Sequence, residues 1–453
     1  MRRTGAAIAI VVLLVSACGI GIGKPGESAP AASLPAAATP AVPSAPSRST
    51  PPASEPTVML PPEAGETWLV VAEKGSDGLQ VIAASSGRLL TPIPDGVPAT
   101  TWTRLLTATP ANGKTVVAEF KVENIDNPAS LTLDGSWRFP TIGDDPQPVG
   151  LSGDASTQVL VDGSAGSATA STSRFAIVPA SLHGTQRVIS LNGHFEFDAI
   201  STDGRQLYVV EHLAGPPAGH YQVRQVDVST GALQPGVIAD KRNVGEAMGG
   251  YPLGQLRLNG GLVVTLYAGA ERPFIHALHT LEGFAFCIDL PATGDGSATS
   301  ASDWGIAAAA GGPEYAVNAS VGLVVQVDAG AGNVLRSAQL KPMAGTGIVL
   351  AKFSDGVGGQ VGRRAIVAPD GRWLYAAGAG GILAISTSDL KATGRWLESQ
   401  SVDAMALSKD GSRLFALLHG SGRIAVIDTA AGTVLGMVPG DGYTRIAAAL
   451  PGE

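Results

Sequence analysis

One nine-residue pattern recurs three times in this chain and restricts its fold more than any other feature. An apolar segment leads into an Asp-Gly pair and a second apolar segment follows; the copies span 200–208, 367–375 and 407–415. An Asp-Gly pair between apolar runs predicts a β-hairpin, because glycine readily adopts the positive φ that the turn requires. The sequence therefore predicts a chain built from repeated antiparallel hairpins.

A second hairpin pattern alternates with the first, and in it two apolar strands flank a short polar turn that contains glycine. Copies of this second pattern span 79–90, 226–233, 327–335 and 427–435. Weaker copies of the Asp-Gly pattern span 109–117 and 151–160. Two hairpins in succession form a four-stranded antiparallel meander, so the chain is expected to repeat this unit.

The expected meanders number eight. They lie near 68–93, 101–140, 149–191, 195–239, 254–291, 304–340, 364–397 and 402–438. Stacked radially, such sheets form a β-propeller, which protects strand edges and buries both faces of each sheet. We therefore expect an all-β fold, a β-propeller of four-stranded antiparallel blades, with eight blades favoured over seven. A pair of β-sandwiches is the alternative, although it would not naturally repeat one pattern at both Asp370 and Asp410.

The two ends of this array complement each other. The first unit, beginning at Trp68, lacks an opening strand, while 443–450 has a strand pattern without a unit of its own. We expect the C-terminal strand to pair with the Trp68 segment and to complete the N-terminal blade.

The last two units carry a family resemblance. Ile427-Asp428-Thr429 followed by Gly432-Thr433-Val434, with Asp410-Gly411-Ser412 upstream, resembles the YVTN-type, WD-repeat-like propellers of bacterial extracytoplasmic proteins. The combined Gly-His and Trp-Asp signature of true WD repeats is absent from the sequence, because no Trp is followed by Asp. The resemblance implies a propeller that works outside the cytoplasm.

Composition agrees with an all-β repeat protein and argues against nucleic-acid binding. The 453 residues include 59 Gly and 31 Pro, an unusual richness in turn formers, and 45% of residues are hydrophobic. The formal net charge is −8, the wrong sign for a surface that binds phosphates, so nucleic acid is not an expected partner.

The N-terminus has the pattern of a secretory signal. Arg2 and Arg3 precede an apolar stretch that is too short to span a bilayer, and the stretch ends in Val15-Ser16-Ala17-Cys18. This ending resembles the bacterial lipoprotein box, which implies that 1–17 is a signal peptide and that Cys18 is lipidated and becomes the mature N-terminus. An ordinary cleaved signal with an incidental cysteine is the alternative. The expected location is the extracytoplasmic face of the cell membrane, with a lipid anchor.

After the signal peptide, the propeller domain is expected to span 66–453, and residues 18–65 form a separate segment before it. The segment is rich in Pro, Ala, Ser and Thr and carries few charges, so it cannot build a core and is expected to be a disordered tether. In a polyproline conformation of about 3.1 Å per residue, it could hold a folded domain up to roughly 100 Å from the lipid.

The chain has two cysteines, and lipidation of Cys18 would leave Cys287 alone. No internal disulfide is then possible, and the core must stabilise itself. Cys287 lies in an alternating strand pattern without a nearby basic residue, so we interpret it as a buried thiol rather than a nucleophile.

The best candidate site is a set of charged residues at the expected channel mouth. Alignment of the three clear copies on the turn Asp places Glu196, Arg363 and Asp403 seven residues upstream, where an innermost strand begins. Four arginines begin or occupy comparable strands and extend this set: Arg104, Arg257, Arg364 and Arg445. The set could bind a polar ligand, or it could be a ring of salt bridges that closes a water-filled channel.

Other groups of polar residues are interpreted as loops. His276 and His279 lack the third ligand of a zinc motif, and His212 and His220 flank a Gly/Pro-rich stretch, so we interpret all four as loop histidines. Asp144 and its neighbour lack the alternating ligands of a calcium loop. We therefore expect no metal and no cofactor.

No catalytic motif is present in the sequence, since serine nucleophile elbows and complete phosphate-binding glycine motifs are absent. The expected function is a noncatalytic binding or scaffold module of the cell envelope, a monomer whose partner is an envelope protein or polysaccharide. The alternative is an extracytoplasmic hydrolase, lactonase or lyase that acts on a sugar-like ligand at the channel mouth, through Glu196, Arg363 and Asp403.

Overall fold

The computed structural model describes residues 68–451, with internal gaps. The gaps are 76–77, 94–95, 99–103, 122–123, 143–148, 164–171, 214–219, 241, 243–247, 269–271, 292–302, 310 and 344–362. The signal segment, Cys18, the tether and Asp144 therefore lie outside the described residues. Within the described residues, no helical segment has the length and apolar character needed to cross a bilayer.

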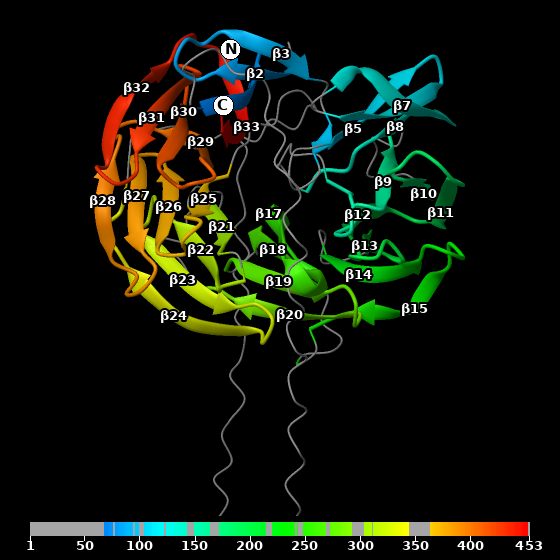
Figure 1. The fold of residues 1–453 in the computed structure, drawn as a ribbon. Coiled ribbons are helices and arrows are strands. Elements are labelled where there is room, and N and C mark those ends of the chain that lie inside the picture. The colour runs from blue at the N-terminus through cyan, green and yellow to red at the C-terminus, as the bar shows by residue number, and fades with distance from the viewer. Residues whose placement is uncertain are drawn as a thin grey trace, which may run out of the picture. The chain divides into compact units, whose positions relative to one another are not determined.

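The described strands form eight antiparallel sheets, arranged as the blades of a β-propeller (Figure 1). This confirms the expected fold class and blade number. Blade one contains β1 (Trp68–Lys74), β2 (Leu79–Ala83), β3 (Leu89–Ile93) and β33 (Tyr443–Pro451), and blade two contains β4 (Val97–Pro98), β5 (Arg104–Ala111), β6 (Lys114–Lys121) and β7 (Asn124–Asp134). Blade three contains β8 (Trp137–Arg138), β9 (Thr157–Asp162), β10 (Thr172–Pro179) and β11 (Arg187–Asn192). Blade four contains β12 (Phe195–Ile200), β13 (Gln206–His212), β14 (His220–Asp227), β15 (Leu233–Ile238) and the short β16 (Met248–Gly249).

Blades five to eight repeat the same strand order, and a 3-10 turn, η1 (Asn259–Gly261), lies between the first two strands of blade five. Blade five contains β17 (Tyr251–Arg257), β18 (Leu262–Ala268), β19 (Phe274–His279) and β20 (Phe284–Asp289). Blade six contains β21 (Trp304–Ala308), β22 (Glu314–Asn318), β23 (Leu323–Asp328) and β24 (Asn333–Gln339). Blade seven contains β25 (Ala365–Val367), β26 (Trp373–Gly378), β27 (Gly381–Ser386) and β28 (Ala392–Trp396), and blade eight contains β29 (Val402–Leu407), β30 (Arg413–Leu418), β31 (Arg423–Asp428) and β32 (Thr433–Val438).

The last strand closes the ring beside the first. β33 pairs antiparallel with β1, from Trp68 opposite Pro451 to Lys74 opposite Tyr443, and Figure 1 shows the two ends of the propeller side by side. The expected closure is therefore confirmed. Strands from both ends of the propeller share one sheet, so neither end can leave without breaking a ladder of backbone hydrogen bonds.

Two blade boundaries differ from the sequence-based units. Val97–Pro98 opens blade two, and Trp137–Arg138 opens blade three instead of ending blade two. Each of these opening strands has two residues, which is too short to show the alternation of apolar and polar residues that predicts a strand.

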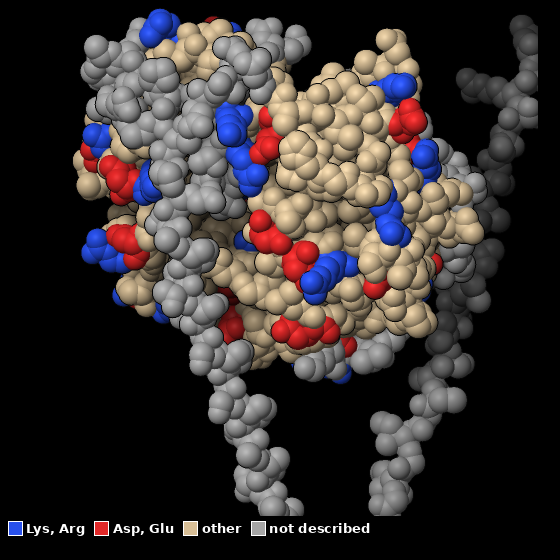
Figure 2. Space-filling model, turned by 45° about the vertical axis from the view of Figure 1, so that its right-hand side comes forward, with Lys and Arg blue, Asp and Glu red and all other residues tan. Residues whose placement is uncertain are grey.

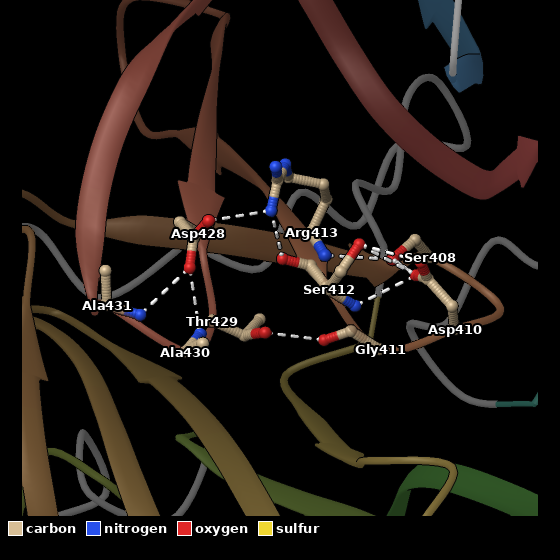
Figure 3. Close-up of polar contacts among 9 residues, drawn as sticks. All are labelled: Ser408, Asp410, Gly411, Ser412, Arg413, Asp428, Thr429, Ala430 and Ala431. Carbon is tan, nitrogen blue, oxygen red and sulfur yellow. Dashed lines mark hydrogen bonds and ion pairs between the residues drawn. The ribbon is translucent and has the colours of Figure 1, made fainter.

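The Asp-Gly turn of blade eight shows why the repeated pattern forms a hairpin (Figure 3). The Asp410 carboxylate accepts hydrogen bonds from Ser408 Oγ at 2.7 Å and from the Ser412 backbone at 2.9 Å. Gly411 adopts a φ of 76°, which a side chain would make strained. Ser408 Oγ also accepts the Arg413 backbone N–H at 2.9 Å, so one short polar network connects the two strands.

The hydrophobic core lies between the blades rather than within one centre. Eight main clusters of buried apolar residues each join two neighbouring blades among the described residues. In β30, Leu414 packs toward blade seven and the next residue, Phe415, packs toward blade one. Because successive strand residues point to opposite faces, both faces of a blade are buried, and each large side chain contributes about 1.5–3 kcal/mol.

Charged side chains are spread over the propeller surface. Figure 2 shows basic and acidic groups interspersed on one face, with uncharged surface between them.

Candidate functional site at the entry rim

All inner strands begin on one face of the ring, because every blade repeats the same strand order around one axis. We call the ends at which the inner strands begin the entry rim. It includes His194–Glu196 before and in β12, Asp303 before β21, Arg363–Arg364 before β25, Ser401–Asp403 before and in β29, and Tyr443–Arg445 in β33.

Glu196 lies at the rim in contact with two histidines. Its Oε2 is 3.2 Å from His212 Nε2, and its Oε1 is 3.6 Å from His194 Nε2. The two imidazole rings stack with centroids 4.2 Å apart and planes 16° apart. The ligand atoms of all three side chains lie within 4.8 Å of one another. We call these three residues the blade-four cluster.

Burial and neighbouring groups lower the pKa values of two members of the blade-four cluster, Glu196 and His194. Contact with His212 is the main cause that lowers the pKa of Glu196, and nearby His194 and Arg138 lower it further. Burial lowers the pKa of His194, and the charge of His212 adds to this effect. Near neutral pH, the site therefore holds a carboxylate and an uncharged imidazole at His194.

A second histidine–carboxylate pair lies at the rim in blade eight. His419 Nδ1 lies 3.0 Å and 3.1 Å from the two carboxylate oxygens of Asp403. The Asp403 side chain is 7% exposed, whereas that of Glu196 is 59% exposed. Burial raises the pKa of Asp403, and its contacts with His419 partly offset the rise.

Two further arginines at the rim, Arg364 and Arg363, contact residues of neighbouring blades. Arg364 Nη1 contacts Asp303 Oδ1 at 2.8 Å, and Ser320 Oγ donates a 2.6 Å hydrogen bond to Asp303 Oδ2. Arg363 is exposed, and its carbonyl accepts the backbone N–H of Met405 at 3.0 Å.

Arg445 is buried in the strand that closes the ring. Its Nε lies 3.2 Å from Glu73 Oε2, which joins β33 to β1 through side chains as well as backbone. Arg364 and Arg445 are therefore already paired with carboxylates. Both interpretations of the predicted set, a ligand site and a ring of salt bridges, are compatible with this geometry.

Arg104 and Arg257 do not lie with the other predicted site residues. Arg257 ends β17, where its Nη1 donates a 2.7 Å hydrogen bond to the Ile200 carbonyl, and burial lowers its pKa to about 10. Arg104 begins β5, the second strand of blade two, and contacts Glu119 at 3.0 Å. It lines a cavity of about 10 Å³ between blades two and three, which no residue of the blade-four cluster lines.

Beneath the rim, Asp198 is a buried carboxyl group in a β-bulge of β12. The register of β12 against β13 shifts between Phe197 and Ala199, and the Asp198 side chain turns into the protein, where the residue is 2% exposed. Its Oδ2 has no hydrogen-bond partner among the described residues. Burial raises the pKa of Asp198 to about 7.

The interpretation of four histidines as loop residues is wrong. His276 and His279 lie in β19, His212 ends β13 and His220 begins β14. Their strand patterns were hidden because polar histidines interrupt the apolar alternation. Cys287, in β20, is partly buried with its Sγ 3.7 Å from His276 Nδ1.

Sequence alignment contained a signal for the missed histidines. When the Asp-Gly copies are aligned on the turn Asp, His212 and His419 both lie nine residues downstream. The same alignment places His194 and Ser401 nine residues upstream, and the structure pairs each with its histidine: His212 N–H donates to His194 O at 3.0 Å, and His419 N–H to Ser401 O at 2.9 Å.

The fold and the rim together define a β-propeller protein with clustered ionisable side chains where its inner strands begin. No protein-family model and no curated protein matches the chain. Among solved structures, two of Citrobacter koseri AztD are similar in fold: a crystal structure with a TM-score of 0.51 and 12% identity, and an apo structure with 0.50 and 13%, each covering 85% of this chain and 98% of that chain.

Dihydro-heme d1 dehydrogenase NirN in complex with DHE has a TM-score of 0.48 and 11% identity, and covers 88% of this chain and 82% of that chain. At such low identities, the two AztD structures show the propeller fold alone, and the NirN structure adds no argument.

Proposed function

We propose that this chain is a lipid-anchored, extracytoplasmic β-propeller that serves as a noncatalytic binding or scaffold module in the cell envelope, with the entry rim as its ligand surface. The observation that supports this function best is the gathering of ionisable side chains from blades four, seven, eight and one at one end of the ring. A rim that collects charges of both signs suits a polar ligand, such as an envelope protein or polysaccharide.

The anchor is argued from the sequence. Val15-Ser16-Ala17-Cys18 supplies the small residues and the thiol that lipid attachment requires, and the Pro-rich 18–65 supplies a spacer. The YVTN-type resemblance of the last two blades supports the same extracytoplasmic location. Acyl chains contribute about 0.8 kcal/mol per buried CH₂, so two or more chains on Cys18 would hold the protein at the membrane stably.

Metabolic labelling with a fatty acid tests the anchor. The wild-type chain and a Cys287→Ala control should carry label in the membrane fraction, whereas Cys18→Ala should carry none. Inhibition of lipoprotein signal peptidase should make the precursor accumulate. Label on Cys18→Ala, or the absence of accumulated precursor, would refute the anchor.

Site-specific crosslinking tests the rim as the ligand surface. A photo-crosslinking residue at Arg363, exposed at the rim, should capture an envelope protein or polysaccharide in intact cells. The matched control is the same residue at Arg372, which is also exposed but lies in the turn at the other end of its hairpin. Equal capture at both positions would contradict binding through the rim.

The enzyme alternative predicts a different result at the same residues. A hydrolase, lactonase or lyase should lose turnover of a sugar-like substrate in Glu196→Gln or Asp403→Asn while its melting temperature stays near that of the wild type. A binding module has no turnover to lose, so turnover that depends on these carboxylates would replace the proposed function by the enzymatic one.

A further inference from the structure

The blade-four cluster has the backbone geometry of a built three-ligand site. Residues two apart along a strand point to the same face. His194 directly precedes β12 and Glu196 is its second residue, so we expect the two side chains to project together. His212 lies on the neighbouring strand directly opposite His194, as its backbone hydrogen bond to His194 O shows. Two paired strands therefore hold all three side chains on one face at the rim, without depending on a long loop.

The distances between ligand atoms fit a small divalent ion. Two ligands that are about 2.1 Å from a tetrahedral Zn²⁺ lie about 3.4 Å from each other. Glu196 Oε2 is 3.2 Å from His212 Nε2, and Glu196 Oε1 is 3.6 Å from His194 Nε2. Both distances are close to this value, and they end at the two different oxygens of the carboxylate. Among the residues that the structure describes, no other set of three His, Cys, Asp or Glu side chains brings its ligand atoms this close together.

One ligand atom has the Glu196 carboxylate 3.2 Å away but forms no aligned hydrogen bond to it. The Nε2 of His212 is buried and forms no aligned hydrogen bond within the described residues, although Glu196 Oε2 is nearby. A buried polar nitrogen without a hydrogen bond is unfavourable, and a metal ion would satisfy it.

We propose that His194, Glu196 and His212 bind one divalent first-row transition metal ion, such as Zn²⁺, at the entry rim. Two imidazoles and one carboxylate suit zinc and its neighbours, whereas Ca²⁺ and Mg²⁺ prefer sites built from oxygen ligands alone. The inference deepens the proposed function because it names a ligand for the same rim, and it rests on that function for the rim's role as a ligand surface.

Binding requires a small rearrangement and leaves a coordination position open. Imidazole lone pairs lie in the ring plane, so the stacked rings of His194 and His212 cannot both point at one ion until one of them turns. Glu196 is more than half exposed, which leaves its carboxylate mobile enough to follow. A site of three protein ligands keeps its fourth position for water or for a group of the partner.

Arg138, in β8 of the neighbouring blade, is the positive charge that acts against the ion. It is exposed and lies near enough to lower the pKa of Glu196. Its long side chain can move into solvent, so we expect it to weaken metal binding without preventing it. Removal of this charge in Arg138→Gln should tighten zinc binding by a few-fold.

Equilibrium dialysis of the purified mature chain against Zn²⁺ alone, followed by elemental analysis, tests the site. The wild-type chain should bind about one zinc per chain, and a double variant, His194→Ala with His212→Ala, should bind none. Glu196→Gln should lower the affinity at least about tenfold, since loss of even an outer-shell partner costs about 10–100-fold. The matched control is His183→Ala, which removes an exposed histidine outside the cluster and should bind like the wild type.

Thermal unfolding of each zinc-free variant shows whether that variant folds. Because Glu196→Gln changes an exposed side chain, this variant still tests the site if the double variant fails to fold. Absence of zinc from the wild type would overturn the inference. Equal zinc content in the wild type and in the folded variants of the cluster would also overturn it. So would zinc that is lost from Cys287→Ser but retained by the variants that lack cluster side chains. Because labelling and crosslinking in cells test the proposed function separately, either proposal can fail alone.

Discussion

Blades four and eight carry the same pair of groups at the rim in two different environments. In both, an acid lies seven residues before the turn Asp and a histidine nine residues after it: Glu196 with His212, and Asp403 with His419. The two blades differ nine residues before the turn, where blade four has His194 and blade eight has Ser401. One blade therefore offers three metal ligands, and the other offers a two-residue ion pair.

The position of a β-bulge explains the difference in burial. In blade eight, the register shifts between Val402 and Ala404, so Asp403 itself is the bulged residue and turns inward. In blade four, the shift falls between Phe197 and Ala199, which buries Asp198 and leaves Glu196 exposed on the regular strand. The position of the bulge thus determines whether the rim carboxylate is buried in the protein or exposed to solvent.

The largest expected effect concerns the bulged residue of blade four. Burial raises the pKa of Asp198 to about 7, so the folded chain holds a proton that the unfolded chain releases above pH 4. Stability should therefore fall as the pH rises from about 4 to 7, by at most about 4 kcal/mol. Asp198→Asn cannot ionise and should unfold at a higher temperature than the wild type at pH 8, with little difference at pH 4. Parallel pH profiles of melting temperature for the two proteins would contradict the buried, protonated carboxyl group.

Exchange of the residue that differs between the two blades, His194 in blade four and Ser401 in blade eight, tests whether the third ligand determines zinc binding. His194→Ser gives blade four the composition of blade eight and should weaken zinc binding at least about a hundredfold, because a direct ligand contributes more than an outer-shell partner. Ser401→His gives blade eight a third ligand, but Asp403 is buried, so any second site should be weaker than that of blade four. Titration calorimetry with Zn²⁺ measures both. An unchanged affinity in His194→Ser would show that the third ligand does not distinguish the blades.

The smallest expected effect is on the stability of the zinc-free protein. Asp403→Ala removes the buried partner of His419 and should lower the free energy of unfolding by about 1–3 kcal/mol. Glu196→Ala removes an exposed group and should change it by less than about 0.5 kcal/mol. Denaturant unfolding in the presence of a chelator compares the two. Equal losses would mean that the rim environments of the two blades are alike.

The sequence predicted the ring well because its signals are local. Turn pairs such as Asp410-Gly411 and short apolar runs such as that of β30 mark hairpins directly, and the unpaired pattern at 443–450 predicted the closing strand. Where opening strands have two residues, as at Val97 and Trp137, the local signal is absent and the boundaries were misplaced.

The rim was predicted less completely, because its contacts join residues far apart in the chain. The register on the turn Asp correctly brought Glu196 and Asp403 to strand starts. It could not show that Arg257 ends its strand, nor that a bulge buries Asp198, since a bulge depends on pairing between strands. The same alignment places His194 nine residues before a turn Asp, and His212 and His419 nine residues after one.

Anomalous diffraction at the zinc edge, from crystals of the chain grown with Zn²⁺, tests the central claim most directly. The account predicts a peak bounded by His194 Nε2, His212 Nε2 and the Glu196 carboxylate, and none beside Asp403 and His419. A map without a peak at the blade-four cluster, or with its main peak at blade eight, would contradict the account.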